Sequence, residues 1–140
     1  MYLSAKNTNA DWIVGDFNII YPDGSVIEKK FFDFGELNNI GFLKYCFLNG
    51  DFYYTGRLIK KELFKIANIF VPAEITFGED NVAVIQLGFH LKKAIKVNTV
   101  VLYYVQRISS VTNKYEKRDL IPNFSMFYVT GFIYHIYITD

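Results

Sequence analysis

Two adjacent segments constrain the fold most, because a strong helix pattern leads directly into a strand pattern. Apolar residues at helical spacing predict a helix over residues 78–93, with Lys92 and Lys93 in its last turn. Residues 96–106 are mostly apolar and alternate poorly, which predicts a strand buried on both faces or packed against helices. The apolar positions that define the helix face are Val84, Leu87 and Leu91. A helix that feeds such a strand indicates the α/β fold class.

The rest of the chain before residue 78 divides into shorter elements. A β-branched, aromatic strand and a turn rich in Pro, Asp and Gly precede a returning strand, which predicts a hairpin. A helix closed by an Asn-Gly pair follows, and then a short extended piece and a short helix. The predicted ranges are 11–21 and 26–34 for the hairpin, 34–49 for the first helix, 56–59 for the extended piece and 60–68 for the second helix. We expect one α/β unit with few strands.

Composition limits the classes of function. At 140 residues, 51% apolar and 19% aromatic, the chain is long and apolar enough to bury a core. Fifteen basic against fourteen acidic residues provide no electrostatic basis for nucleic-acid binding. The single cysteine, Cys46, excludes an internal disulfide and predicts a small buried hydrophobe. His90 and His135 have no acid or cysteine at ligand spacing, so no metal site is expected in this chain. No signal peptide is visible, which predicts a cytoplasmic protein.

Glu79 and Asp80 fall in the first turn of the helix predicted over residues 78–93. Acids there are stabilised by free N–H groups and by the positive end of the helix, so the pair is in the first place a helix-start signal. Asp80 also lies four residues before Val84, which places it on the buried face rather than the solvated one. A carboxylate at the rim of a core suits a positioned general base.

Two further segments carry polar groups beside predicted strands. Arg107 and Ser109 follow the strand over residues 96–106, and a guanidinium forms paired hydrogen bonds with phosphate oxygens. The alternative is a solvent-exposed arginine followed by a polar turn. Gly56 precedes an extended piece that begins with Arg57, and a glycine there permits close backbone approach.

In their order along the chain, three segments resemble the C-terminal half of the family-2 glycosyltransferases. The segments are Gly56-Arg-Leu-Ile-Lys-Lys-Glu-Leu-Phe64, Thr76-Phe-Gly-Glu-Asp-Asn81 and Leu102-Tyr-Tyr-Val-Gln-Arg107-Ile-Ser-Ser-Val-Thr112. Those enzymes have a GT-A fold and move a sugar from a nucleotide donor to an acceptor hydroxyl. The resemblance covers about residues 9–115. It implies that residues 1–115 are the C-terminal part of a GT-A domain and that residues 116–140 form an apolar, aromatic tail.

The resemblance also implies roles for single residues. An acidic motif of the family supplies the catalytic base, which assigns that role to Asp80 and a supporting role to Glu79. Residues near the donor and acceptor supply the substrate contacts, with Arg107 as a diphosphate contact. The substrate-binding residues implied in this way are Gly56, Arg57, Arg107 and Ser109. The expected reaction inverts the anomeric carbon in the assembly of a polysaccharide or glycoconjugate.

Part of the family pattern has no counterpart here. The nucleotide-binding βαβ region is absent, and the sequence contains no Asp-x-Asp metal motif. We therefore expect a truncated form or fragment that holds no cofactor itself, with Mn²⁺ or Mg²⁺ bound only by the complete enzyme. The cut should leave an unpaired strand edge at residues 12–20 and cause self-association. The alternative is a non-catalytic remnant that packs on a partner subunit.

Residues 124–138 are almost entirely apolar or aromatic. This stretch is shorter than the ~20 residues that a membrane span needs. Three interpretations stay open: a core helix or strand, a helix in the membrane interface, or an end that packs on a missing partner. The second would place the chain at the inner face of a membrane.

Overall fold

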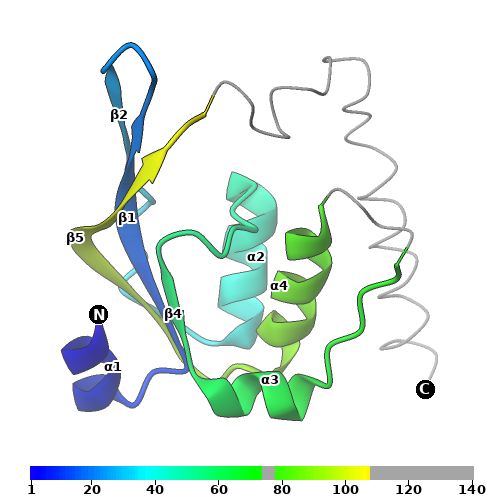
Figure 1. The fold of residues 1–140 in the computed structure, drawn as a ribbon. Coiled ribbons are helices and arrows are strands. Elements are labelled where there is room, and N and C mark those ends of the chain that lie inside the picture. Colours follow the sequence, from blue (N-terminus) through cyan, green and yellow to red (C-terminus); the bar gives the residue numbers. More distant parts are fainter. Residues whose placement is uncertain (74–77, 108–140) are drawn as a thin grey trace.

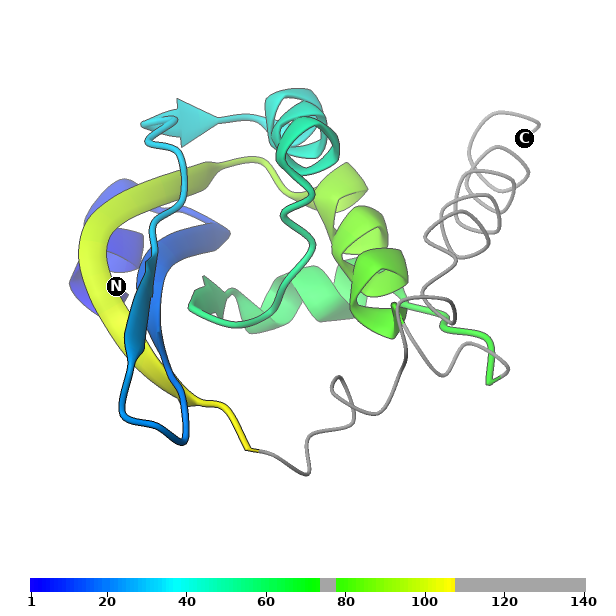
Figure 2. The same cartoon turned by 90° about the horizontal axis from the view of Figure 1, so that it is seen from above.

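The computed structural model describes residues 1–73 and 78–107, which form a curved sheet with three helices inside its curve (Figure 1, Figure 2). The strands are β1 (Trp12–Ile20), β2 (Val26–Lys29), β3 (Glu36–Leu37), β4 (Arg57–Ile59) and β5 (Ala94–Val105). The helices are α1 (Tyr2–Thr8), α2 (Asn39–Asn49), α3 (Lys61–Ala67) and α4 (Glu79–His90). Helices α2, α3 and α4 cover one face, and α1 lies outside the curve. This mixed architecture confirms the α/β class.

Strand β1 is the centre of the sheet rather than its edge. It runs parallel to β5 along its whole length. Its other side pairs with two antiparallel strands, β4 near its start and β2 near its end. The expected unpaired edge at residues 12–20 is therefore wrong, because neighbouring strands occupy both sides.

The core lies between the first half of β1 and the helices. The Trp12 and Phe42 rings pack with their centroids 5.0 Å apart, which joins β1 to α2. Helix α4 is buried on every side from Val82 to Gly88, and the predicted apolar face of this helix is confirmed. Cys46 is buried as predicted, and burial followed by the Asp51 charge raises the pKa of its thiol. The largest fully buried side chains are Trp12, Phe42, Ile13, Ile85, Leu87, Val14, Val84 and Cys46.

The second half of β5 has a different environment from the first. Ala94 and Lys96 are buried, but residues 102–105 are exposed. The prediction of a strand buried on both faces is therefore wrong for this half. Strand β3 pairs only with Ala94 and Ile95, so among the described residues no strand lies on that side of residues 99–105.

Several elements begin or end at residues other than the predicted ones, because local interactions set their ends. The hairpin is confirmed, although its second strand ends at Lys29. The first predicted helix begins at Asn39, because the Asn38 side chain accepts a hydrogen bond from the Gly41 N–H at 2.9 Å and caps it. It ends as predicted, at the left-handed Gly50.

Beyond these boundaries, α4 ends at His90, so Lys92 and Lys93 lie in the connection to β5 rather than in the helix. No helix in residues 1–73 or 78–107 is long and apolar enough to cross a membrane. The predictions for residues 116–140, including the tail over 124–138, fall outside the described residues.

Candidate functional site

The acidic pair begins α4, as the sequence predicted. Gly78 precedes the helix in a left-handed conformation, with φ of 81°, and Glu79 and Asp80 form the first turn. Glu79 is exposed, whereas Asp80 is half-buried. Burial, followed by the negative charge of Glu79, raises the pKa of the Asp80 carboxyl above its ordinary value. A carboxylate with a raised pKa is a stronger base, so its environment suits proton abstraction at neutral pH.

The direction of α4 decides where this pair lies. Helix α4 runs back along the sheet, and β5 follows it after a short connection (Figure 1). The start of α4 therefore faces the carboxyl ends of the parallel strands β1 and β5. Ligands of open α/β sheets bind outside the carboxyl ends of strands. Arg107 follows β5 at this end of the fold, but it lies beyond the exposed residues 102–105 and so farther along the sheet than the start of α4.

Tyr54 joins this group and was not predicted from the sequence. Burial, followed by the charge of Asp80, raises the pKa of the Tyr54 phenol to about 12. The hydroxyl therefore stays protonated at neutral pH and can donate a hydrogen bond. Tyr54 lies two residues before Gly56, so the structure brings the segment before β4 to the acidic turn. Nothing in the sequence distinguishes this tyrosine from the other ten.

Gly56 is needed for a close approach of two backbones. Its φ is +71°, and a Cβ at this position would lie 2.8 Å from the carbonyl oxygen of Gly15. The Gly56 carbonyl also accepts a hydrogen bond from the Gly15 N–H at 2.9 Å. The expected close backbone approach is confirmed, and its partner is β1.

Arg57 points into the protein and pairs with Asp51, in the loop after α2. The two side chains are only 2% and 4% exposed. The guanidinium carbon also lies 4.2 Å from the centroid of the Phe31 ring. Burial lowers the pKa of Arg57, and the charge of Asp51 opposes this effect. These contacts of Arg57 with Asp51 and Phe31 are structural.

One nitrogen of Arg57 differs from the rest of the group. Nη1 is buried and has no hydrogen-bond partner among the described residues. The assignment of Arg57 to substrate binding stays a prediction, as do those of Gly56 and Arg107, and Ser109 lies outside the described residues.

The described residues contain no group of three or more His, Cys, Asp or Glu side chains that could hold a metal ion. Asp80 also lines neither of two pockets found in the described part of the chain. The site therefore consists of a half-buried acid, a neighbouring acid and a tyrosine at the carboxyl edge of the sheet. The sequence matches no protein-family model and no curated protein.

Proposed function

We propose that the chain is the C-terminal part of a GT-A glycosyltransferase domain and supplies the catalytic base for sugar transfer to a hydroxyl. The observation that carries the proposal is the Asp80 carboxyl, half-buried with a raised pKa where α4 begins. The family-2 resemblance of three segments supports the same residue. Tyr54, two residues before the first of these segments, is near enough to Asp80 for the charge of Asp80 to raise the pKa of its phenol.

In the proposed reaction Asp80 removes the proton of an acceptor hydroxyl. The acceptor oxygen forms a bond to the anomeric carbon, while the bond from that carbon to the nucleotide diphosphate breaks. Glu79 keeps Asp80 basic through its charge, and the neutral Tyr54 hydroxyl orients the acceptor. In a complete enzyme, Mn²⁺ or Mg²⁺ would stabilise the leaving diphosphate.

The test combines this chain with the product of any reading frame directly upstream of Met1. Transfer of labelled sugar from a panel of nucleotide sugars is then measured. We expect Asp80→Asn to lower the rate about 10²- to 10⁴-fold, because general-base catalysis contributes this much. Glu79→Gln should have a smaller effect, and Asp23→Asn, in the exposed hairpin turn, should have none. Transfer that survives Asp80→Asn would refute the assignment.

The chain on its own should not bind a nucleotide sugar tightly, because its sequence has no nucleotide-binding βαβ region and no Asp-x-Asp motif. Calorimetry with UDP- and GDP-sugars and Mn²⁺ measures this. Low-micromolar binding, about 8 kcal/mol, would contradict the expectation that another polypeptide segment holds the donor.

A second candidate function is packing against a partner, and the second half of β5 favours it. Residues 99–105 contain no charged side chain, and among the described residues one edge of this stretch has no strand beside it. Natural proteins protect such edges with charges, proline or a covering element. Exposed apolar side chains occupy the same stretch: Val100, Leu102, Tyr103, Tyr104 and Val105. Absence of transfer activity, together with stable association through this edge, would favour this function over the first.

A further inference from the structure

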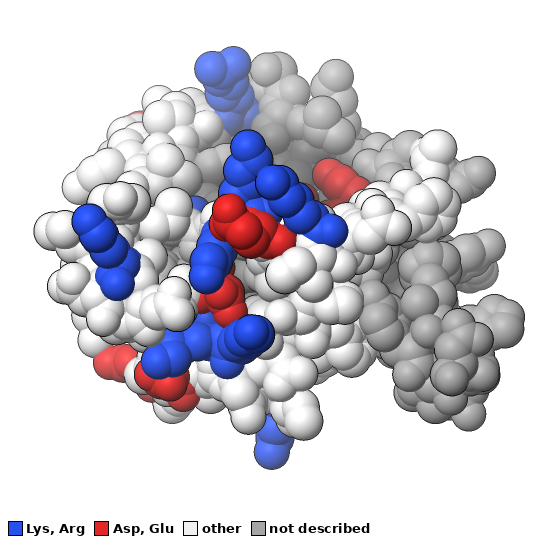
Figure 3. Space-filling view, turned by 90° about the horizontal axis from the view of Figure 1, so that it is seen from below, with Lys and Arg blue, Asp and Glu red and all other residues white. Residues whose placement is uncertain are grey.

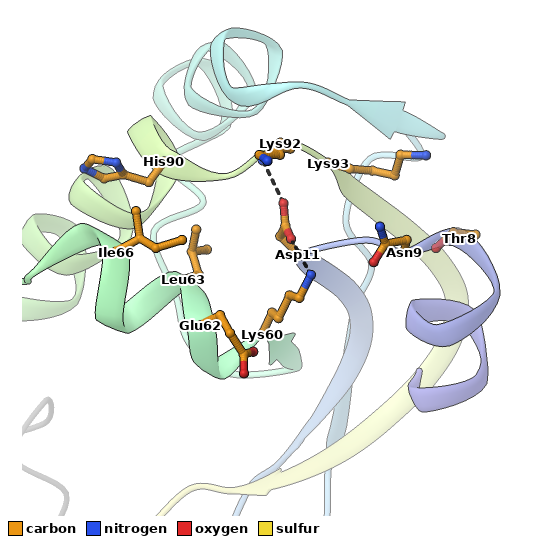
Figure 4. Close-up of a pocket in the computed structure, with 10 residues that line it drawn as sticks. All are labelled: Thr8, Asn9, Asp11, Lys60, Glu62, Leu63, Ile66, His90, Lys92 and Lys93. Carbon is orange, nitrogen blue, oxygen red and sulfur yellow. Dashed lines mark hydrogen bonds and ion pairs between the residues drawn. The ribbon is translucent and has the colours of Figure 1, made fainter.

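A pocket of about 310 Å³ lies at the opposite end of α4 from Asp80 (Figure 4). It forms where three connections meet: α1 to β1, β4 to α3, and α4 to β5. Three lysines from two of these connections line it: Lys60, Lys92 and Lys93. We call it the basal pocket. It is separate from the site proposed for sugar transfer and does not depend on that proposal.

Asp11 holds the backbones of all three lysines in place. Its carbonyl accepts a hydrogen bond from the Lys60 N–H at 2.8 Å, and its own N–H donates to the Lys93 carbonyl at 2.9 Å. Its Oδ2 accepts from the Lys92 N–H at 2.8 Å. One residue thus fixes the backbone of both connections, so the positions from which the three lysine side chains extend are held in place.

The charges of the pocket favour an anion. Lys60 pairs with Asp11 Oδ1 at 3.4 Å, and Lys93 pairs with Glu36, outside the pocket, at 3.2 Å. The Lys92 ammonium has no ion-pair partner among the described residues. Figure 3 shows Lys and Arg side chains gathered around a few acidic ones on the face seen from below.

A cation is a poorer ligand for the same pocket. Both carboxylate oxygens of Asp11 already accept hydrogen bonds from lysines. Glu62 is the other acid that lines the pocket, and the described residues offer no cluster of three metal-ligating side chains. Lys60 and Lys93 are already paired with Asp11 and Glu36, so Lys92 is the lysine of the lining that has no ion pair among the described residues.

We propose that the basal pocket binds a phosphate group, with Lys92 as its principal contact and Lys60 beside it. A phosphate dianion has enough oxygens to accept hydrogen bonds from the Lys92 and Lys60 ammonium groups and from the Asn9 amide, which also lines the pocket. The same chemistry is offered by inorganic phosphate and by the phosphate headgroup of a membrane lipid.

The first test is titration of the full chain with inorganic phosphate at constant ionic strength, followed by amide chemical shifts in nuclear magnetic resonance. We expect saturable shifts at residues 92 and 93 and a dissociation constant that rises with added salt. Lys92→Gln should weaken binding about fivefold, because it removes one ammonium from a solvated site. Lys65→Gln is the matched control: it makes the same charge change on the exposed surface of α3, outside the pocket, and should leave affinity unchanged.

A variant that should strengthen binding distinguishes the loss of a binding contact from the loss of folded structure. Glu62→Gln removes a negative charge from the pocket lining and should strengthen phosphate binding about twofold. No saturable binding, or equal loss in Lys65→Gln and Lys92→Gln, would overturn the proposal.

The second test distinguishes the two sources of phosphate. Sedimentation with phosphatidylcholine vesicles is compared with and without phosphatidic acid. Binding only to the acidic vesicles that is lost in Lys92→Gln identifies a lipid headgroup as the ligand. Binding of inorganic phosphate without vesicle binding identifies a free phosphate or phosphate ester. Either outcome supports a phosphate site, and failure in both tests refutes it.

Discussion

The two ends of the parallel pair β1 and β5 differ in what covers them. At the amino-terminal end, Trp12, Val14 and Ala94 are fully buried in the core that the sheet forms with the helices. At the carboxyl end, residues 102–105 of β5 are exposed although they are all apolar or aromatic. Both α4 and β5 have 12 residues, but a helix of this length spans ~18 Å and a strand ~40 Å. The helix layer therefore covers only part of the strand length.

This difference explains where the acidic turn lies. Asp80 begins the helix that covers the sheet. It therefore lies at the border between the amino-terminal end of the strand pair, here called the closed end because the helices cover it, and the exposed carboxyl end, here called the open end. A helix N-terminus by itself stabilises an ionised acid. Burial and Glu79 act in the opposite direction and raise the pKa of Asp80. The raised pKa of Asp80 therefore results from its surroundings and not from its place at the start of the helix.

The largest effect should come from removing a side chain at the closed end. Trp12→Ala leaves a cavity in the core and should lower the free energy of unfolding by about 3–5 kcal/mol. Leu102→Ala, on the open half of β5, should cost about 0.5 kcal/mol or less. Urea unfolding followed by circular dichroism measures both. Similar costs for the two variants would mean that the open half is covered in solution.

The next effect tests backbone strain at each end. Gly56→Ala should cost about 2–3 kcal/mol, because φ is +71° and the new Cβ would meet the Gly15 carbonyl oxygen. Gly24, in the hairpin turn at the open end, has φ of +81° but no atom within 4 Å of its Cβ position. Gly24→Ala should therefore cost only about 1 kcal/mol, from the strained φ alone. Thermal unfolding of the two variants measures the two losses of stability. Equal losses would show that the close approach of Gly56 to the Gly15 carbonyl does not contribute.

Sequence patterns predicted helix α4 and its buried face at the closed end, but they did not predict the exposure of β5 at the open end. The spacing of Val84, Leu87 and Leu91 predicts α4 and its buried face, since burial there follows from periodicity. The exposure of β5 could not be predicted, because an apolar run looks the same whether a strand is covered or not. Which strand lies at the edge depends on pairing between distant segments, and for this reason the edge was misplaced at β1.

The residues of the candidate site also fall into two groups, those that a local sequence pattern predicts and those that it does not. Glu79 and Asp80 were predicted from helix-start chemistry, which is local. The place of Tyr54 in the site depends on its interaction with Asp80, which is distant in sequence, and the inward direction of Arg57 depends on its ion pair with Asp51 in the loop after α2. The spacing of residues along the chain predicts neither interaction. The end of α4 moved to His90 because a distant carboxylate, that of Asp11, binds the Lys92 N–H.

A smaller effect concerns association through the open end. If the uncharged stretch of β5 is a packing surface, Tyr103→Lys should weaken self-association about tenfold, or 1.4 kcal/mol, because an edge charge opposes strand pairing. Tyr2→Lys is the control, since Tyr2 is 70% exposed on α1, away from this edge. Light scattering over micromolar concentrations measures the equilibrium. A wild-type chain that stays monomeric throughout would contradict the packing function.

The smallest effect is a change in how stability depends on pH. The pKa of Asp80 is raised above its ordinary value of 3.8 in the folded protein, so the folded state binds this proton more tightly than the unfolded state does. Stability should therefore fall as pH rises above 3.8 through the folded pKa, and the penalty is complete above it. Asp80→Asn removes that penalty, so its stability relative to the wild type should increase as pH rises from 3.8 through the folded pKa.

Asp23 supplies a control of opposite sign at the open end. Hydrogen bonds from the Ser25 hydroxyl and N–H lower the pKa of Asp23, so its contribution to stability is present above 3.8 and is lost as pH falls through the folded pKa. Asp23→Asn should therefore lose stability relative to the wild type as pH rises through this lower window. Urea unfolding across the pH range measures both differences. Slopes of the same sign in the two variants would show that burial does not act on Asp80 as the structure indicates, and the case for Asp80 as a base would lose its electrostatic support.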